Sequence, residues 1–272
     1  MNYVFVCGAD DPEMEIIRDL VTRRGYRIVQ ALANGNPVIS RTAYSADGFS
    51  HDIGDLDGPL VWVECAFVDA SVERTFVVDH HHEGDPGYGC GAEDFWNGSS
   101  LGQVCNLIGE PATEYLMLAA AADHCLAEAY RGRCPGVTPE ALRAWRLSWR
   151  ARRRGLQFEQ AEERLERAFR AMAELPVIQF MGQQVVDGTG VQIPELSEAV
   201  AISGRAFLYT QKDWNTGLLK ANLLGASPDA TSAWMRCMEA CPEVASVYGN
   251  PNRTYAGAYF KPSAFLTSDA RG

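Results

Sequence analysis

Short apolar runs alternate with amphipathic segments in the first half of the chain. Four of these runs have the length and β-branched content of buried strands: residues 3–7, 26–33, 60–63 and 75–78. Residues 14–24 have apolar positions at helical spacing, and Gly25 ends this segment. A strand, an amphipathic helix and another strand in this order predict an α/β fold, with a mainly parallel sheet and helices on both faces.

The pattern changes twice along the remainder of the chain. Helical spacing continues through segments that begin near Ser99, Tyr115, Thr138 and Phe158. From Pro176 onward we expect short strands and turns, with one helix over residues 229–240. We therefore predict three parts: an α/β domain over residues 1–135, a helical linker over 136–175, and a smaller C-terminal α+β domain over 176–272.

Composition and charge narrow the class of protein. The chain has 272 residues, of which 47% are hydrophobic, and this is enough for two cores. The net charge of −11 argues against binding to duplex nucleic acid or to an anionic membrane surface. We see no apolar run of about 20 residues and no basic leader, so we expect a cytoplasmic protein without a membrane partner.

The eight cysteines are scattered along the chain and form no CxxC pair. Cys237 and Cys241 have the spacing of one helix face, which is unlike the paired ligands of a zinc knuckle. We expect reduced, mostly buried thiols and no structural zinc site.

Acids and imidazoles follow three of the predicted strands. Asp11 and Glu13 come after the first strand, Glu64 after residues 60–63, and Asp79 with His80, His81 and His82 after residues 75–78. Because ligands of open α/β sheets bind at the carboxyl ends of the strands, this pattern predicts a divalent-metal site there. An alternative for Asp10 or Asp11 is a structural role as the N-cap of the helix that follows.

Two further charged features have alternatives. Asp123 lies within a nearly apolar helical run, where a carboxylate is costly unless it is paired or bound to metal. It could instead lie at an exposed helix end. The helix from Thr138 has a basic face from Arg143 to Arg154, and the acids that follow favour a solvated linker helix over a phosphate-binding patch.

These motifs together resemble the DHH phosphoesterase superfamily. The resemblance covers most of residues 3–130 and is sharpest at Asp79-His80-His81, with Ser99-Ser100 and Asp123 following in order. It implies metal-dependent hydrolysis of phosphoester or phosphoanhydride bonds.

The resemblance also implies roles for individual residues. Asp79 and His81 would serve catalysis, Asp79 by orienting His80 and His81 by facing the substrate phosphate. The metal ligands would be Asp11, Glu13, Glu64, His80 and Asp123, with Glu64 as the bridging carboxylate. The substrate contacts would be Ser99, Ser100, His82 and, in the C-terminal domain, Arg253, with Lys212 and Arg205 as secondary candidates.

The chain departs from the family pattern at its first motif. The family's histidine is missing from residues 8–13, and glutamates stand at Glu13 and Glu64 where aspartates are usual. His51, His82 or His124 could replace the missing imidazole, or one metal site is lost.

Three hypotheses about function follow. The first is a phosphoesterase that uses divalent metal, with Mn²⁺ favoured and Mg²⁺, Fe²⁺ or Zn²⁺ compatible, on a nucleotide or short single-stranded oligonucleotide. The second is a protein that binds a nucleotide or phosphorylated ligand without hydrolysis, and the third is a mononuclear metal enzyme of nucleotide modification. A homodimer is compatible with all three.

Overall fold

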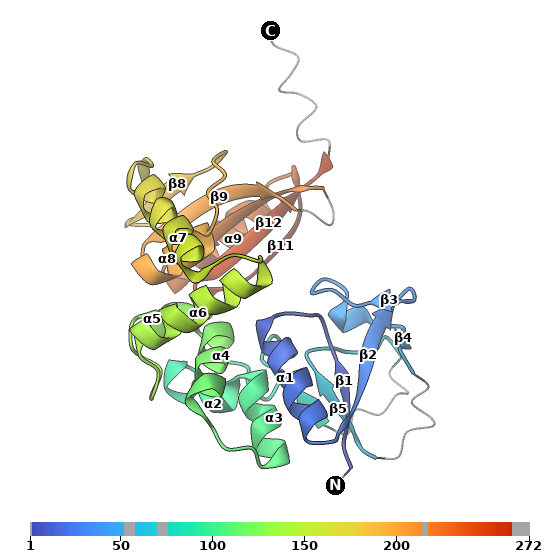
Figure 1. Ribbon diagram of the computed structural model, residues 1–272. Coiled ribbons are helices and arrows are strands. Elements are labelled where there is room, and N and C mark those ends of the chain that lie inside the picture. Colours follow the sequence, from blue (N-terminus) through green and yellow to red (C-terminus); the bar gives the residue numbers. More distant parts are fainter. Residues whose placement is uncertain (1, 52–57, 70–75, 214–216, 263–272) are drawn as a thin grey trace. The chain divides into compact units, whose positions relative to one another are not determined.

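The computed structural model describes residues 2–51, 58–69, 76–213 and 217–262. Its contacts divide the chain into two compact units, Met1–Leu142 and Arg143–Gly272 (Figure 1). Each unit contains its own sheet, and the following paragraphs treat the two units separately.

The first unit is built on a mixed sheet with strand order β3-β2-β1-β5-β6. Four strands are parallel neighbours: β2 (Arg27–Ala33), β1 (Val4–Cys7), β5 (Leu60–Val63) and β6 (Phe76–Val78). The short strands β3 (Asn36–Pro37) and β4 (Gly48–Phe49) pair with β2 in the antiparallel direction. The α/β class predicted from the sequence is confirmed, and the carboxyl ends of β1, β5 and β6 lie along one edge.

One face of this sheet is covered differently from the prediction. Val6, Ala31 and Trp62 pack there against buried residues of the segments 38–46 and 65–67. Within the described parts of the connections between β2 and β6, the structure has the 3-10 helix η1 (Ala43–Ser45) but no α-helix. In the described residues, short loops and this 3-10 helix cover the face, where we expected α-helices, because these segments have few apolar positions at helical spacing.

The helices of the first unit pack on one another. They are α1 (Pro12–Arg23), α2 (Phe95–Gly98), α3 (Ser100–Ile108), α4 (Glu114–His124) and α5 (Leu126–Tyr130), and α1, α3 and α4 are mutual neighbours. The single helix expected from Tyr115 to Ala129 is interrupted at Cys125, whose backbone (φ −151°, ψ 46°) is not helical. Residue spacing alone does not show this interruption, because both halves are apolar.

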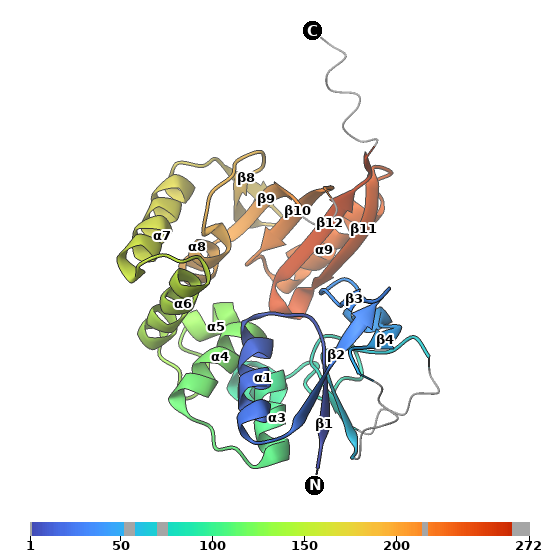
Figure 2. The ribbon, with the colours of Figure 1, turned by 45° about the vertical axis from the view of Figure 1, so that its right-hand side comes forward.

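The second unit contains a six-stranded sheet with order β11-β12-β10-β9-β8-β7, which Figure 2 shows from β8 to β11. The strands are β7 (Val177–Phe180), β8 (Gln183–Gly188), β9 (Ala206–Lys212), β10 (Leu219–Leu224), β11 (Val244–Asn250) and β12 (Tyr255–Phe260). All neighbours are antiparallel except β8 and β9. The sheet agrees with the expected α+β texture of the C-terminal part.

Helices α7 (Phe158–Ala173), α8 (Leu196–Ser203) and α9 (Pro228–Glu239) belong to this unit, and the 3-10 helix η4 (Pro251–Arg253) precedes β12. Buried residues of α9 pack with one set of strand residues, and those of α7 and α8 pack with another. Residues 199–203, which we expected in strands or turns, are helical in α8. This apolar run is short enough to form either a strand or a helix, and packing against α7 stabilises the helix.

The basic face of α6 (Pro139–Arg153) also differs from the prediction of a solvated helix. The side chains of Arg146 and Arg150 are only 14% and 16% exposed, and both bind the buried Glu198 carboxylate. Arg150 also binds Glu195 through its Nε atom at 2.6 Å. These arginines are internal ion-pair partners of the second unit.

Across the described residues, no helix combines the length and the apolar character that crossing a membrane requires.

Candidate metal centre

Asp79 organises the loop that follows β6. Its Oδ1 atom accepts hydrogen bonds from the backbone N–H groups of His80 (2.7 Å) and His81 (3.1 Å), and lies 2.8 Å from the His81 Nδ1 atom. The Tyr44 hydroxyl donates to its Oδ2 atom at 3.0 Å. Burial raises the pKa of Asp79, but the hydrogen bonds and charge of His81 outweigh this effect and lower it. Asp79 therefore remains ionised and holds the two histidines in place.

Residues that the sequence analysis missed hold the backbone of this loop. Gln103 accepts from the Asp79 N–H at 3.3 Å and donates to the Asp79 carbonyl at 3.1 Å, and the Gly87 N–H donates to the same carbonyl at 2.9 Å. A Cβ atom on Gly87 would lie 1.9 Å from the Gly98 carbonyl oxygen. Tyr44 and Gln103 lie 35 and 24 residues from Asp79 in the chain. Without a local motif, their roles could not be read from the sequence.

Glu13 connects the first helix to the third. Its side chain is buried in the first turn of α1, and its Oε1 atom accepts from the Leu101 backbone N–H of α3 at 3.0 Å. Ser99 caps α3 by accepting from the Gly102 N–H at 3.0 Å, so the serine fixes the helix end that binds Glu13. The Oε2 atom of Glu13 has no hydrogen-bond partner among the described residues.

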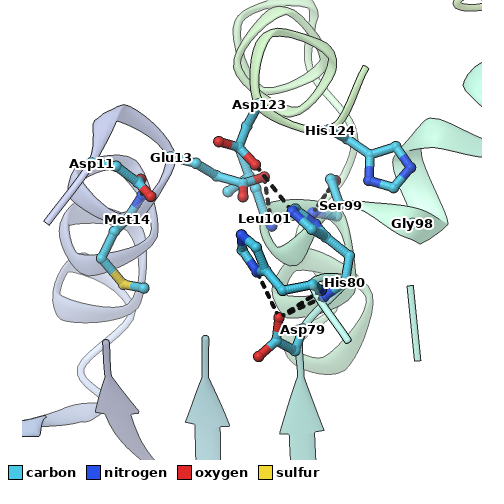
Figure 3. A network of polar contacts seen from close by, with 12 residues as sticks. Asp11, Glu13, Met14, Asp79, His80, Gly98, Ser99, Leu101, Asp123 and His124 are labelled. Atoms are coloured by element: carbon cyan, nitrogen blue, oxygen red, sulfur yellow. Dashed lines mark hydrogen bonds and ion pairs between the residues drawn. The ribbon is translucent and has the colours of Figure 1, made fainter. Parts of the chain in front are cut away.

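Four acidic and imidazole side chains converge above the strand ends. Ligand atoms of Glu13, Glu64, His80 and Asp123 all lie within 4.8 Å of one another. The His80 Nε2 atom is 3.3 Å from the Asp123 Oδ2 atom, and Figure 3 shows Glu13, His80 and Asp123 directed toward one another. A second group, Glu64 with His80 and His81, shares two members with the first.

Each member of this cluster comes from a different element. Glu13 lies on α1, Glu64 follows β5 and His80 follows β6, while Asp123 lies in the last turn of α4. Glu64 has a left-handed backbone (φ 52°), an uncommon conformation for a residue other than glycine and one that is found at functional sites.

The acids of the cluster repel one another. Burial, followed by the charges of Asp11 and Asp123, raises the pKa of Glu64 to about 8. Burial, followed by the charges of Asp123 and Glu64, raises the pKa of Glu13 well above its ordinary value. Without a cation, the protein would keep these groups ionised only at a high cost in free energy. A divalent ion offsets this cost, and mixed carboxylate and imidazole donors suit such an ion, so the residues present fit a metal.

Asp11 lies beside this cluster. Its side chain accepts from the Met14 N–H at 2.7 Å and caps α1, as the structural alternative predicted, and Figure 3 shows it near Met14. Its pKa is raised to about 6 by burial and by Asp123, so it also feels the charge of the cluster. Asp11 is not part of either group of ligand atoms.

His81 lies at the exposed side of the cluster. Burial lowers its pKa, but the hydrogen bond to Asp79 and the charge of Glu64 outweigh this effect and raise it to about 9. In the metal-free protein, the contact between the His81 Nδ1 atom and Asp79 favours the protonated ring. Such a group suits a phosphate oxygen.

The histidines considered as replacements contact other groups, although the His124 ring lies 5.0 Å from the His80 ring, centroid to centroid. The His51 ring is 3.0 Å from the Ser50 hydroxyl, and the His124 Nε2 atom is 3.0 Å from the Cys90 carbonyl oxygen. The exposed His82 packs edge-on against the Tyr44 ring with centroids 4.2 Å apart. Neither group of ligand atoms found among the described residues includes any of the three.

The predicted substrate contacts are distributed over both units. Ser99 caps α3, and Ser100 is fully buried close to Glu64. Arg253, with the secondary candidates Arg205 and Lys212, lies in the second unit. The roles of all of these residues in substrate binding stay predictions.

Comparison with known proteins identifies no family. No family model matches the chain, and no curated protein does. Among solved structures, the chain is similar to a pGpG-specific phosphodiesterase, PggH, of Vibrio cholerae, with 10% identity, a TM-score of 0.41, and coverage of 96% of this chain and 94% of that one. It is also similar to a putative family II inorganic pyrophosphatase of Methanococcus jannaschii, with 14% identity, a TM-score of 0.24, and coverage of 94% and 84%. These scores are too low to carry an argument about this chain, so its function must be argued from its own residues.

Proposed function

We propose that the protein is a divalent-metal-dependent phosphohydrolase that acts on a phosphoester or phosphoanhydride bond of a nucleotide or short oligonucleotide. One observation carries the proposal. Three carboxylates and an imidazole, from four different elements, have ligand atoms within 4.8 Å of one another, and three of the four residues are buried. Such a cluster is costly to build without a bound cation and is well suited to hold one.

A metal at this position would be bound by Glu13, Glu64, His80 and Asp123. A divalent ion supplies Lewis acidity, which stabilises negative charge on phosphoryl oxygens and makes bound water more acidic. The two ligand groups share Glu64 and His80, so the residues leave room for one ion or two, and metal content distinguishes these cases.

The protein's own groups would position the substrate. Asp79 holds the backbone and ring of His81, and we propose that, when a single ion is held by the first group, this ring donates a hydrogen bond to a phosphate oxygen.

The net charge of the protein favours a small substrate. A net charge of −11 disfavours long duplex nucleic acid, whose binding depends on many cationic contacts. A small phosphorylated substrate needs only one metal centre and a few cationic groups, which matches the residues present.

Glu13 provides a specific test. In Glu13→Gln, the amide oxygen can still accept from the Leu101 N–H, while the negative charge is lost. Glu15, two residues later on α1 and exposed, provides the matched control Glu15→Gln. Elemental analysis of protein purified without chelator measures bound metal. Activity with Mn²⁺ or Mg²⁺ is measured as mononucleotide formation from a dinucleotide, and as phosphate release from a nucleoside diphosphate and from pyrophosphate.

The proposal predicts bound metal and activity in the wild-type protein and in Glu15→Gln. Removing a residue that only orients a metal ligand lowers metal affinity by roughly 10–100-fold. Because Glu13 would bind the metal itself, Glu13→Gln should lower Mn²⁺ affinity by more than this. Protein that binds Mn²⁺ but hydrolyses none of these substrates would favour the non-hydrolytic binding protein. Protein that binds no metal after Mn²⁺ addition would overturn the proposal.

A further inference from the structure

Two of the eight cysteines, Cys125 and Cys134, are in direct contact with each other. The Sγ atoms of Cys125 and Cys134 lie 3.0 Å apart in a hydrogen bond. All eight cysteines are free thiols in the structure, and their scattered positions in the sequence do not show that these two are in contact. A pair of sulfurs at this distance has chemistry that a single buried thiol lacks.

The surrounding fold holds the two sulfurs together. Cys125 is the non-helical residue between α4 and α5, and the chain turns back after α5 to reach Cys134. Glu128 fixes this turn, since its carboxylate binds the side chains of Arg131 and Arg133 at 2.5 Å each. Its carbonyl oxygen also accepts from the backbone N–H groups of both arginines. The pair is therefore preorganised by contacts that do not involve sulfur.

A shared metal ion does not explain this pair. A thiolate zinc site needs four ligands, and the potential metal-binding groups found in the described residues contain no cysteine. The nearest imidazole in the chain, His124, has its Nε2 atom 3.0 Å from the Cys90 carbonyl oxygen. The remaining chemistry of two adjacent thiols is oxidation to a disulfide.

We propose that Cys125 and Cys134 form a redox-active dithiol, which hydrogen peroxide or another peroxide converts reversibly to a disulfide. The S–S distance has to fall from 3.0 Å to about 2.05 Å, a movement of about 1 Å. The hydrogen bond from Cys125 lowers the pKa of the Cys134 thiol against the opposing effect of burial, and this favours a reactive thiolate.

The reaction balances with peroxide as the oxidant. One thiolate attacks a peroxide oxygen and breaks the O–O bond, which gives a sulfenic acid and hydroxide. The second thiol then attacks the sulfenic sulfur and forms the S–S bond, and its proton leaves with the sulfenic hydroxyl group as water. The proton that the first thiol lost on ionisation neutralises the hydroxide. In total, the two thiols lose two protons and two electrons, and one peroxide becomes two waters.

The sequence allows each cysteine to be followed alone. Cleavage after arginine and glutamate leaves Cys125 in the peptide 115–128 and Cys134 in the peptide 134–140, each with a single cysteine. Full-length protein is treated with hydrogen peroxide at a slight molar excess, its remaining thiols are alkylated, and the digest is analysed by mass spectrometry with and without reduction.

The expected result is a linked pair of these two peptides, two mass units lighter than their sum, which reduction separates. It should form before Cys90, the unpaired cysteine whose carbonyl faces His124, is modified. The control Cys90→Ser should form the same link, and Cys134→Ser should not. If Cys125 and Cys134 remain fully alkylatable while other cysteines oxidise, the proposal is wrong, and the wild-type measurement decides this without any variant.

Discussion

Replacing Asp79 with asparagine removes a charge and leaves most of the geometry intact. Asp79 Oδ1 accepts from the His80 and His81 backbones and lies beside the His81 ring, and an amide oxygen can keep these contacts. The new NH₂ group would face the Tyr44 hydroxyl, which can rotate to accept from it. The variant therefore tests the charge of Asp79 and not its shape.

The expected effect can be estimated from the role of Asp79. It contacts no ligand atom of His80 directly, but it fixes the backbone on which His80 stands and the ring of His81. Losing such a supporting carboxylate lowers metal affinity by about 10–100-fold, or roughly 1.4–2.8 kcal/mol. Tyr44→Phe removes one hydrogen bond to the same carboxylate and should cost about 1 kcal/mol, close to fivefold in affinity.

Calorimetric titration with Mn²⁺ measures both effects, and circular dichroism confirms that each variant is folded. Asp85→Asn is the matched control, because Asp85 accepts from the His82 N–H at 2.6 Å in the same loop but binds neither His80 nor His81. It should change affinity by no more than about twofold. Folded Asp79→Asn protein with wild-type Mn²⁺ affinity would refute the role assigned to Asp79.

Three further predictions concern stability and packing. In Gly8→Ala, the new Cβ atom would lie 2.3 Å from the Glu64 carbonyl oxygen. We therefore expect the free energy of unfolding to fall by about 1–3 kcal/mol and Mn²⁺ binding to weaken. In the control Gly48→Ala, the nearest atom to the new Cβ lies at 3.7 Å, and Mn²⁺ binding should not change. Glu198→Gln removes the carboxylate charge that Arg146 binds and one of the two that Arg150 binds, and should lower the free energy of unfolding in urea by about 3–5 kcal/mol, because both arginines are mostly buried. Glu163→Gln, in an exposed ion pair, should leave the urea midpoint unchanged. Chelation of bound metal should lower the midpoint of thermal unfolding, because an ion present at 100 times its Kd stabilises the folded state by about 2.7 kcal/mol. A midpoint that does not change when Mn²⁺ is added to metal-free protein would contradict the metal centre.

Local features of the chain were enough to predict most of its elements. The β-branched runs at residues 3–7 and 60–63 form β1 and β5, because such residues favour strands in any buried setting. Ser99 caps α3 as its position before an apolar helix suggests. The parallel order of β5 and β6 also brings Glu64 and Asp79 to one edge, as expected for acids that follow two strands of a mainly parallel sheet.

All four members of the cluster were expected as metal ligands, but the separate place of Asp11 required tertiary structure. Glu13 faces the cluster while Asp11 caps its own helix, and the sequence alone left both possibilities open for these neighbouring acids. The Tyr44 bond to Asp79 and the Cys125–Cys134 pair depend on turns whose path no local pattern determines. Side-chain contacts between distant segments form only when the whole unit packs, because the free energy that selects them comes from burial shared among many residues.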